Sequence, residues 1–253
     1  MQNNLSFFPV KKNILGVEVS DALEYEILES VVDFIEKTKK NAYIVTPNPE
    51  MVVAAAKNHV FKKALNGADL ALCDGFGLYV AGRILGRPLS SRIIGTNFVE
   101  NLCEKVANQP IRVGFLGGKQ GVAMKAAERL RKKYPGLLVS FAGEEWGTIP
   151  SGVVENSKLK IENSLDILFV ALGHPKQELW MAEHLGKIPV RVMVGVGGAF
   201  DQIVDSSLRP PLYISSIGMG WLYRLVRQPW RFKRQLALVQ FLGMLLHARF
   251  FSH

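Results

Sequence analysis

The chain has 253 residues, of which 48% are hydrophobic and 21% charged, and its formal net charge at pH 7 is +9. These proportions are ordinary for a folded globular protein and exclude a predominantly disordered chain. The two cysteines, Cys73 and Cys103, form no CxxC pair, and residues 1–12 lack the pattern of an export signal, so we expect a protein of the reducing cytoplasm. No apolar run reaches the roughly 18 residues that a membrane-spanning helix needs.

Taken in chain order, short apolar segments alternate with amphipathic ones. The apolar segments show no polar alternation, which is typical of strands covered on both faces by helices. Helices are predicted at 21–40, 120–133 and 175–185, and the first begins with acidic residues and ends in KTKK, as the helix dipole favours. The predicted strands are 42–46, 70–73, 111–117, 137–142, 166–172 and 191–196.

This order of elements predicts an α/β fold with a mostly parallel sheet flanked by helices. In such folds the binding groups gather at the carboxyl ends of the strands. The composition changes only near residue 206, so we divide the chain into a catalytic α/β body (1–205) and a basic, amphipathic, helical C-terminal appendage (206–253), which we call the tail.

Positive charge is concentrated in the tail. No acidic residue follows Asp205, whereas seven arginines and lysines do, so the first 205 residues carry a net charge of only +2. This local excess predicts an anionic partner for the tail. The stretch WLYRLVRQPWRFKRQ (221–235) alternates basic and aromatic residues, and Pro229 interrupts it either as a kink or as the start of a second helix.

Two polar loops follow the strands predicted at 42–46 and 70–73. TPNPE (46–50) offers Thr46 and Asn48 as neutral hydrogen-bonding groups, or else forms an ordinary helix N-cap. CDGFG (73–77) places Asp74 directly after a buried strand. Burial there would raise the pKa of its carboxyl and make it a better general base, although a simple Asp-Gly turn is the alternative.

Arginines and a glycine-rich loop come next. RILGRPLSSRIIGTN (83–97) brings three arginines after that aspartate, a pattern that favours an anionic substrate such as a phosphate ester. For Arg83 and Arg87 we favour a solvated helix face. GFLGGKQGVA (114–123) has the strand–glycine–helix order that offers backbone N–H groups to a phosphate. Its spacing matches neither the Walker loop nor GxGxxG, so a tight turn is at least as well supported.

The loop ALGHPKQELW (171–180) opens a helix with a lysine, an amide and a carboxylate. Lys176, Gln177 and Glu178 would all lie in the first turn, where a helix N-terminus suits a sugar phosphate. His174 has no second histidine or cysteine at metal-ligand spacing, so we interpret it as a loop histidine.

The last loop, GVGGAFDQIVD (195–205), contains two aspartates. Asp201 and Asp205 are four residues apart and would share one face of a helix. They could bind a metal or contact ribose hydroxyls, or equally cap the helix and pair with Arg209.

In their order along the chain, these loops resemble the WecG/TagA/CpsF family of bacterial glycosyltransferases. The resemblance runs from about residue 14 to about residue 235 and implies a Rossmann-like fold and an inverting, metal-independent sugar transfer without a cofactor. The family moves a sugar from a UDP-sugar to a polyprenyl-diphosphate-linked sugar on the cytoplasmic membrane face. The motifs that carry it are TPNPEM, DGFGLYVAGRILGRPLSSRIIG, FLGGKQGVA, LFVALGHPKQELW, GVGGAFD, RPP and WLYRLVRQPWR.

The resemblance also assigns roles by matching position. It implies that Asp74 is the general base and that no residue binds a metal. The residues implied to act on the donor UDP-sugar are Thr46, Asn48, Arg92, Lys176, Gln177, Glu178 and Asp201. Those implied to meet the acceptor diphosphate are Arg224, Arg231 and Arg234. The chain departs from the family pattern at Asn97, Ser206 and Gly220, and we expect the transferred sugar to be N-acetylmannosamine, its uronic acid, glucose or a similar sugar.

Two other classes of protein fit parts of the sequence. An NAD-type oxidoreductase would explain the α/β alternation and the glycine loop, although the glycine pattern is imperfect. A nucleic-acid-binding module would explain the basic, aromatic tail, but the apolar run 236–251 argues against it, and we expect no nucleic-acid partner. Instead, Trp221, Trp230 and Phe232 suit the headgroup level of a bilayer. We therefore expect a peripheral protein on the inner face of the bacterial plasma membrane.

Overall fold

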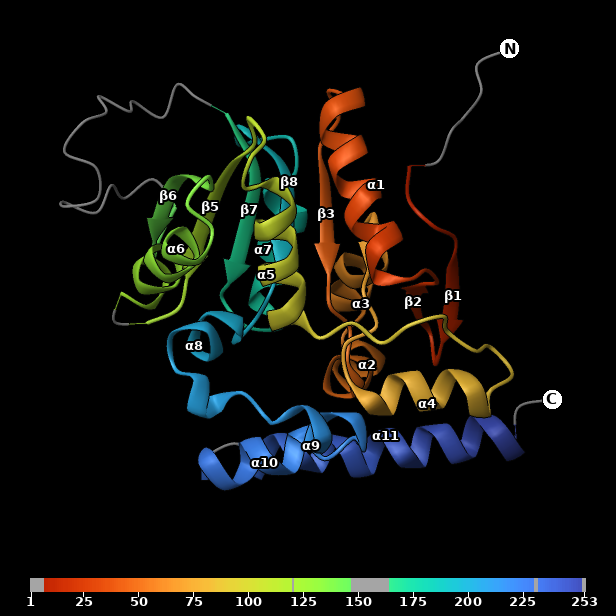
Figure 1. Cartoon of the computed structure of the whole chain (residues 1–253). Coiled ribbons are helices and arrows are strands. Elements are labelled where there is room, and N and C mark those ends of the chain that lie inside the picture. The colour runs from red at the N-terminus through yellow and green to blue at the C-terminus, as the bar shows by residue number, and fades with distance from the viewer. Residues whose placement is uncertain (1–6, 120, 147–163, 230–231, 252–253) are drawn as a thin grey trace, which may run out of the picture.

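The computed structural model describes residues 7–119, 121–146, 164–229 and 232–251. A central β-sheet carries helices on both faces, with a two-stranded hairpin beside it and the tail helices along one edge (Figure 1).

The six strands of the central sheet all run parallel, in the order β4-β3-β8-β7-β5-β6. Every predicted strand is confirmed, and with it the α/β class. Because the strands are parallel, their carboxyl ends meet at one edge of the sheet, which is the lower edge in Figure 1. The strands are β3 (Ala42–Val45), β4 (Leu70–Ala71), β5 (Arg112–Gly117), β6 (Leu138–Gly143), β7 (Leu165–Ala171) and β8 (Val190–Gly195).

Side chains of these strands alternate between two hydrophobic cores, one on each face of the sheet. In β7, Ile167 and Phe169 belong to one core, and Leu168 and Val170 belong to the other. All four are fully buried. A strand with a core on each side has no solvent-facing positions, which is why the sequence shows continuous apolar runs there.

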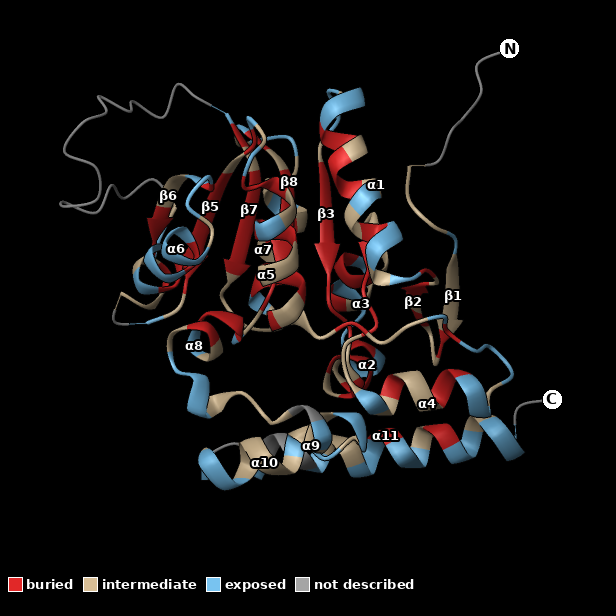
Figure 2. Ribbon diagram, in the orientation of Figure 1, coloured by how far each residue is buried: buried red, intermediate tan, exposed pale blue. Residues whose placement is uncertain are grey.

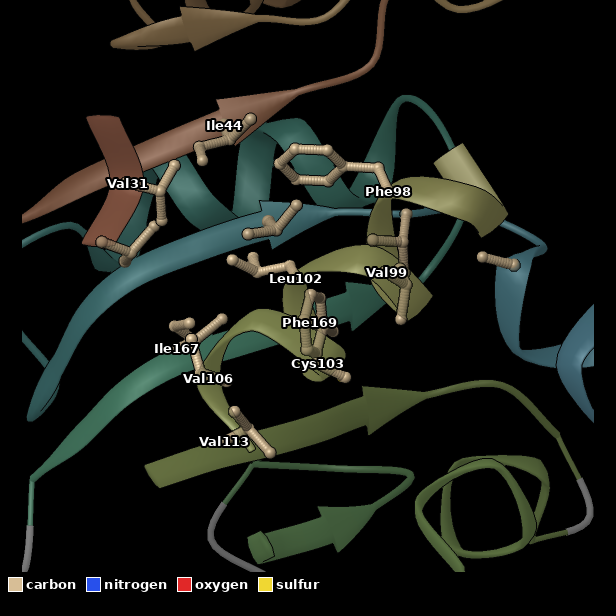
Figure 3. Close-up of a cluster of buried hydrophobic side chains, with 14 of the residues drawn as sticks. Val31, Ile44, Phe98, Val99, Leu102, Cys103, Val106, Val113, Ile167 and Phe169 are labelled. Atoms are coloured by element: carbon tan, nitrogen blue, oxygen red, sulfur yellow. The ribbon is translucent and has the colours of Figure 1, made fainter. Parts of the chain in front are cut away.

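The first core is covered by α1 (Glu24–Lys37), α5 (Gly95–Val106), α6 (Val122–Lys133) and α8 (Ala199–Val204). In α5, Phe98, Val99, Leu102, Cys103 and Val106 recur at helical spacing, so one face of the helix is apolar and packs on the sheet (Figure 3). The predicted helices 21–40 and 120–133 are confirmed as α1 and α6, with ends that lie slightly inside the predicted bounds.

The second core is covered by α2 (Pro49–Lys57), α3 (His59–Asn66), α4 (Phe76–Ile84) and α7 (Lys176–His184). The helix predicted at 175–185 is confirmed as α7. A hairpin of β1 (Lys11–Ile14) and β2 (Val17–Ser20) adds Ile14, Val17 and Val19 to this core. This hairpin was not predicted from the sequence, because its strands, KKNI and VEVS, contain charged residues and form no continuous apolar run.

The tail contains a short 3-10 helix, η1 (Ser206–Leu208), followed by α9 (Leu212–Ser216), α10 (Gly220–Arg227) and α11 (Phe232–Phe250). Pro229 therefore lies between two helices. The helix α11 packs against α2, and its Phe241 and Leu245 are buried in the second core. The tail thus shares a core with the body, and the division at residues 205/206 stays a prediction.

Buried and exposed apolar residues occupy opposite sides of α11 (Figure 2). Val239 is 71% exposed and Phe250 65% exposed, whereas Phe241 is only 5% exposed. Among the described helices, none combines the length and the apolar character needed to cross a bilayer.

Candidate active site

A cavity of about 860 Å³ lies at the carboxyl ends of the strands, between the body and the tail. The loops after β3, β4, β5, β7 and β8 line it, together with residues of η1, α9, α10 and α11. This volume is within the range of pockets that hold small ligands. Regions far apart in the sequence meet here because the carboxyl ends of parallel strands share one edge.

Asp74 is the acidic group in the loop after β4. Its backbone N–H donates to the carbonyl of Pro47 at 3.0 Å, so the loops after β3 and β4 hold each other in place. Gly75 follows with φ of +95°, a conformation that side-chain-bearing residues rarely adopt, and caps α4. This turn exposes the Asp74 carboxyl to the cavity while most of its surface stays covered.

Burial raises the pKa of Asp74 to about 6, above its usual value of 3.8. The charges of Arg224 and Arg92 oppose this rise, as does a hydrogen bond from the backbone N–H of Gly95, whereas the charge of Glu50 adds to it. Gly95 is the first residue of α5, so the carboxylate lies at a helix N-terminus. A carboxylate with a pKa near 6 is a stronger base than an ordinary aspartate and is still ionised at neutral pH.

Arg92 connects the body to the tail. Its Nη1 donates to the carbonyl of Ser215 in α9 at 2.8 Å, and its guanidinium lies 6.0 Å from the centre of the Phe76 ring. Both Arg92 and Phe76 line the cavity. Gly218 packs so tightly on Phe76 that a Cβ there would lie 2.4 Å from the ring. The tail therefore contacts Arg92 and Phe76, which line the cavity together with Asp74.

The TPNPE loop contributes Thr46, Asn48 and Glu50 to the cavity wall. Thr46 is buried and its Oγ1 donates to the carbonyl of Gly195 at 3.0 Å. The Asn48 side chain accepts from the N–H of Met51 at 3.1 Å and caps α2, so the alternative of a helix N-cap is confirmed. A residue can both cap a helix and face a ligand, because Asn retains an amide group after its oxygen is used.

The first turn of α7 separates the three residues predicted there. Gln177 lines the cavity, and its Oε1 accepts from the N–H of Gly197 at 3.0 Å while its Nε2 donates to Glu178 at 2.7 Å. Glu178 is completely buried and is not among the cavity-lining residues, and Lys176 is exposed and also outside the lining. Glu178 therefore orients the Gln177 side chain by accepting this hydrogen bond and does not itself face the cavity.

Asp201 lines the cavity from α8, whereas Asp205 caps η1 by accepting from the N–H of Ser207 at 2.9 Å. Arg209 pairs with Glu100 on α5 at 3.0 Å and also donates to Asn97. Within the described residues, no cluster of three or more histidines, cysteines, aspartates and glutamates has metal-binding geometry.

Of the three tail arginines assigned to the acceptor, the structure describes the side chain of one. Arg224, in α10, lines the cavity and attracts Asp74 electrostatically. Arg231 lies outside the described residues, and Arg234 lies near the start of α11 with a side chain that is likewise outside them. Arg227, one helical turn after Arg224, also lines the cavity.

Some residues that line the cavity were given no role in the sequence analysis. His174, interpreted as a loop histidine, and Phe76 both line the cavity. The loop after β5 contributes Gly118 and Lys119.

Arg83 and Arg87 do not line the cavity. Arg83 donates to the Tyr79 hydroxyl, and Arg87 donates to the carbonyl of Asn13. Both arginines are exposed, which agrees with the solvated face favoured for them.

The chain is similar to known proteins over most of its length. A sequence model described as "Glycosyl transferase WecG/TagA/CpsF family" matches residues 12–253. The chain is similar to two proteins named N-acetylglucosaminyldiphosphoundecaprenol N-acetyl-beta-D-mannosaminyltransferase. It is 33% identical to the one from Bacillus spizizenii, over 88% of this chain and 87% of that protein. It is 30% identical to the one from Staphylococcus aureus, over 85% and 84% respectively.

Proposed function

Because the chain belongs to the WecG/TagA/CpsF family and is a glycosyltransferase, we propose that it moves a sugar from a UDP-sugar to a sugar held on a polyprenyl diphosphate. One observation supports this most directly. Asp74, a carboxyl with a raised pKa, lines a cavity shared with Arg92 of the body and Arg224 of the tail. A base next to fixed positive charge is what a sugar transfer with a diphosphate leaving group requires.

In the proposed reaction Asp74 acts as the general base. Its carboxylate takes the proton of an acceptor hydroxyl as that oxygen attacks the anomeric carbon of the donor sugar. The bond between the anomeric carbon and the diphosphate oxygen breaks at the same time, and UDP leaves with the electron pair. A single displacement of this kind inverts the configuration of the anomeric carbon.

The leaving UDP gains negative charge, and we propose that Arg92 stabilises it while Arg224 meets the diphosphate of the acceptor. Arg92 and Arg224 both line the cavity and both act electrostatically on Asp74. Guanidinium groups bind phosphates through paired hydrogen bonds, so they can supply the positive charge that a divalent ion supplies in other transferases. Metal independence is part of this proposal.

The acceptor is proposed to approach from the tail side. Leu238 of α11 lines the cavity, and the same helix exposes apolar residues, of which Val239, Leu242, Leu246 and Phe250 recur at helical spacing. An apolar stripe beside a basic segment is typical of a helix that lies in the interface of a bilayer. We infer that α11 rests on the inner face of the plasma membrane and places the cavity next to the lipid-linked acceptor.

The relatives' names suggest which substrates to test first. They are named for adding N-acetylmannosamine to N-acetylglucosaminyl-diphosphoundecaprenol. We propose the same acceptor class here, in the synthesis of a cell-surface polymer, with N-acetylmannosamine ahead of its uronic acid and glucose as the transferred sugar.

The test is to incubate the purified full-length chain with a prenyl-diphosphate N-acetylglucosamine and a panel of UDP-sugars. Mass spectrometry of the lipid product then identifies the sugar that was added. The expected result is a mass increase of one sugar unit with one donor and release of UDP. Absence of product with every UDP-sugar, alongside product from a sugar carried on another nucleotide, would overturn the proposed donor class.

A further inference from the structure

His174 and Glu50 form a pair on the wall of the cavity that the proposed reaction does not use. Glu50 lies in the first turn of α2, and His174 lies in the loop between β7 and α7. The Nε2 of His174 is 3.4 Å from Oε2 of Glu50, and both side chains are mostly buried. Both residues also line the cavity that contains Asp74.

His174 also has neighbours in α3 and α7. The ring of Phe61, in α3, is 6.5 Å from it between centroids. The Nδ1 of His174 is buried without a hydrogen-bond partner among the described residues, and so is Oε2 of Glu178. Glu178 interacts electrostatically with His174. The imidazole therefore has acidic groups from two different helices, α2 and α7, as its charged neighbours.

Glu50 in turn acts on Asp74. The charged groups that bear on Asp74 are Arg224 from α10, Arg92 from the loop before α5, and Glu50 from α2, together with the backbone N–H of Gly95. The two arginines favour the ionised carboxylate, whereas Glu50 opposes it. A second ionised carboxylate in the same cavity disfavours the ionised form of the general base, because like charges repel each other.

We propose that His174 is a positioning residue for the sugar transfer: its imidazole holds the Glu50 carboxylate through Nε2 and, in its protonated form, offsets negative charge that Glu50 presents to Asp74. The inference rests on the proposed function, in which Asp74 is the general base. His174 touches no reacting atom in this arrangement and acts only through Glu50. Its consequence is that the pH at which Asp74 becomes active depends on a residue in a different loop.

The experiment compares His174→Gln, Glu50→Gln and the double variant in the full-length chain. The titration of the Asp74 carboxyl carbon is followed by ¹³C NMR, with Asp74→Asn used to assign the signal. The acid limb of kcat/KM is measured in parallel. His184→Gln is the matched control, since His184 stacks on Trp180 and is outside the cavity lining.

Removal of the Glu50 charge should move the Asp74 titration to lower pH, and loss of His174 should move it to higher pH. Each shift should be on the order of half a pH unit, as expected for one nearby charge in a partly solvated site. The double variant should titrate like Glu50→Gln alone, because His174 acts through Glu50. The control should titrate like the unmodified protein.

Two results would overturn the proposal: an unchanged Asp74 titration in His174→Gln, or a double variant that differs from Glu50→Gln. Thermal melting establishes that each variant is folded, and His174→Asn replaces the glutamine variant if that one is not. The NMR titration needs no turnover. A chain that transfers no sugar would therefore count against the proposed function while still deciding the role of His174.

Discussion

Arg224, in a helix of the tail, and Asp74, in the loop after β4 of the body, line one cavity and attract each other electrostatically. The attraction counteracts part of the rise in the pKa of Asp74 that burial causes. The tail therefore contributes to the electrostatics of the candidate base as well as to the wall of the cavity.

Removal of this charge is the first prediction. Arg224→Ala should lower kcat/KM by about 10- to 100-fold, because the variant loses the guanidinium that is proposed to hold the acceptor diphosphate beside Asp74. Arg224→Lys should recover part of the activity, since it keeps the charge but not the paired hydrogen bonds. Arg83→Ala, on the α4 surface, is the matched control and should stay close to the unmodified rate. Equal rates for Arg224→Ala and the control would show that Arg224 does not contribute to the reaction.

The second prediction concerns the base itself. Asp74→Asn should lower kcat by about 10²- to 10⁴-fold, the usual contribution of a general base, while UDP-sugar affinity changes little. Steady-state rates and isothermal titration calorimetry with the donor measure the two effects separately. Near-normal turnover in Asp74→Asn would refute the assignment.

The third prediction is a pH dependence of the rate. Asp74 accepts a proton only when ionised, and its pKa is raised to about 6. The value of kcat/KM should therefore be level above about pH 7 and fall about tenfold per pH unit below about pH 6. A pH–rate profile with one donor checks this, and an acid limb near pH 4 would show that Asp74 is not the group that titrates.

The fourth prediction is that Asp74→Asn stabilises the fold at high pH. The folded-state pKa of Asp74 lies above its ordinary value of 3.8, so folding favours the protonated form of this carboxyl. The resulting stabilisation is present below about pH 4 and is lost as the pH rises through 6. Asparagine does not ionise. The variant should gain about 2 kcal/mol in the free energy of unfolding at pH 8, relative to its effect at pH 4. Urea unfolding at both pH values measures the gain, and an equal effect at both would contradict this origin.

The fifth prediction concerns the exposed stripe on α11. Val239→Glu together with Leu246→Glu should weaken binding to vesicles that contain anionic lipid and reduce transfer to a long-chain prenyl acceptor, because charge on this face opposes insertion into the interface. Transfer to a short, water-soluble acceptor should be retained. Val60→Glu, on an exposed residue of α3, is the control. Unchanged vesicle flotation of the double variant would show that this face of α11 does not bind the membrane.

The body of the fold could be predicted from local sequence, whereas the hairpin at its start could not. Strands such as β7 have both faces buried, so their composition alone marks them. The hairpin strands β1 and β2, KKNI and VEVS, contain charged residues in place of a continuous apolar run, and they depend on packing against the second core. Asp74 was found because it directly follows an apolar run, where the strand end predicts its burial.

The first turn of α7 shows where sequence reasoning is limited. Lys176, Gln177 and Glu178 are consecutive and were predicted to face the donor together, yet only Gln177 lines the cavity. Consecutive residues on a helix point in directions about 100° apart, so one faces the cavity, one the core and one the solvent. His174 presents the reverse case, since its partner Glu50 comes from a different helix and no spacing in the sequence connects them.

The sequence by itself determined the order of strands and helices, the strand-end loops that carry polar groups, and the family, because each depends on residues that are close together in the chain. The tertiary structure decided which of those groups share a cavity, that Arg224 acts on Asp74, and that α11 buries one side against α2 and exposes the other. The physical reason is that electrostatic coupling and burial depend on distance in space. The chain brings these groups together only when the parallel sheet aligns the carboxyl ends of its strands beside the tail.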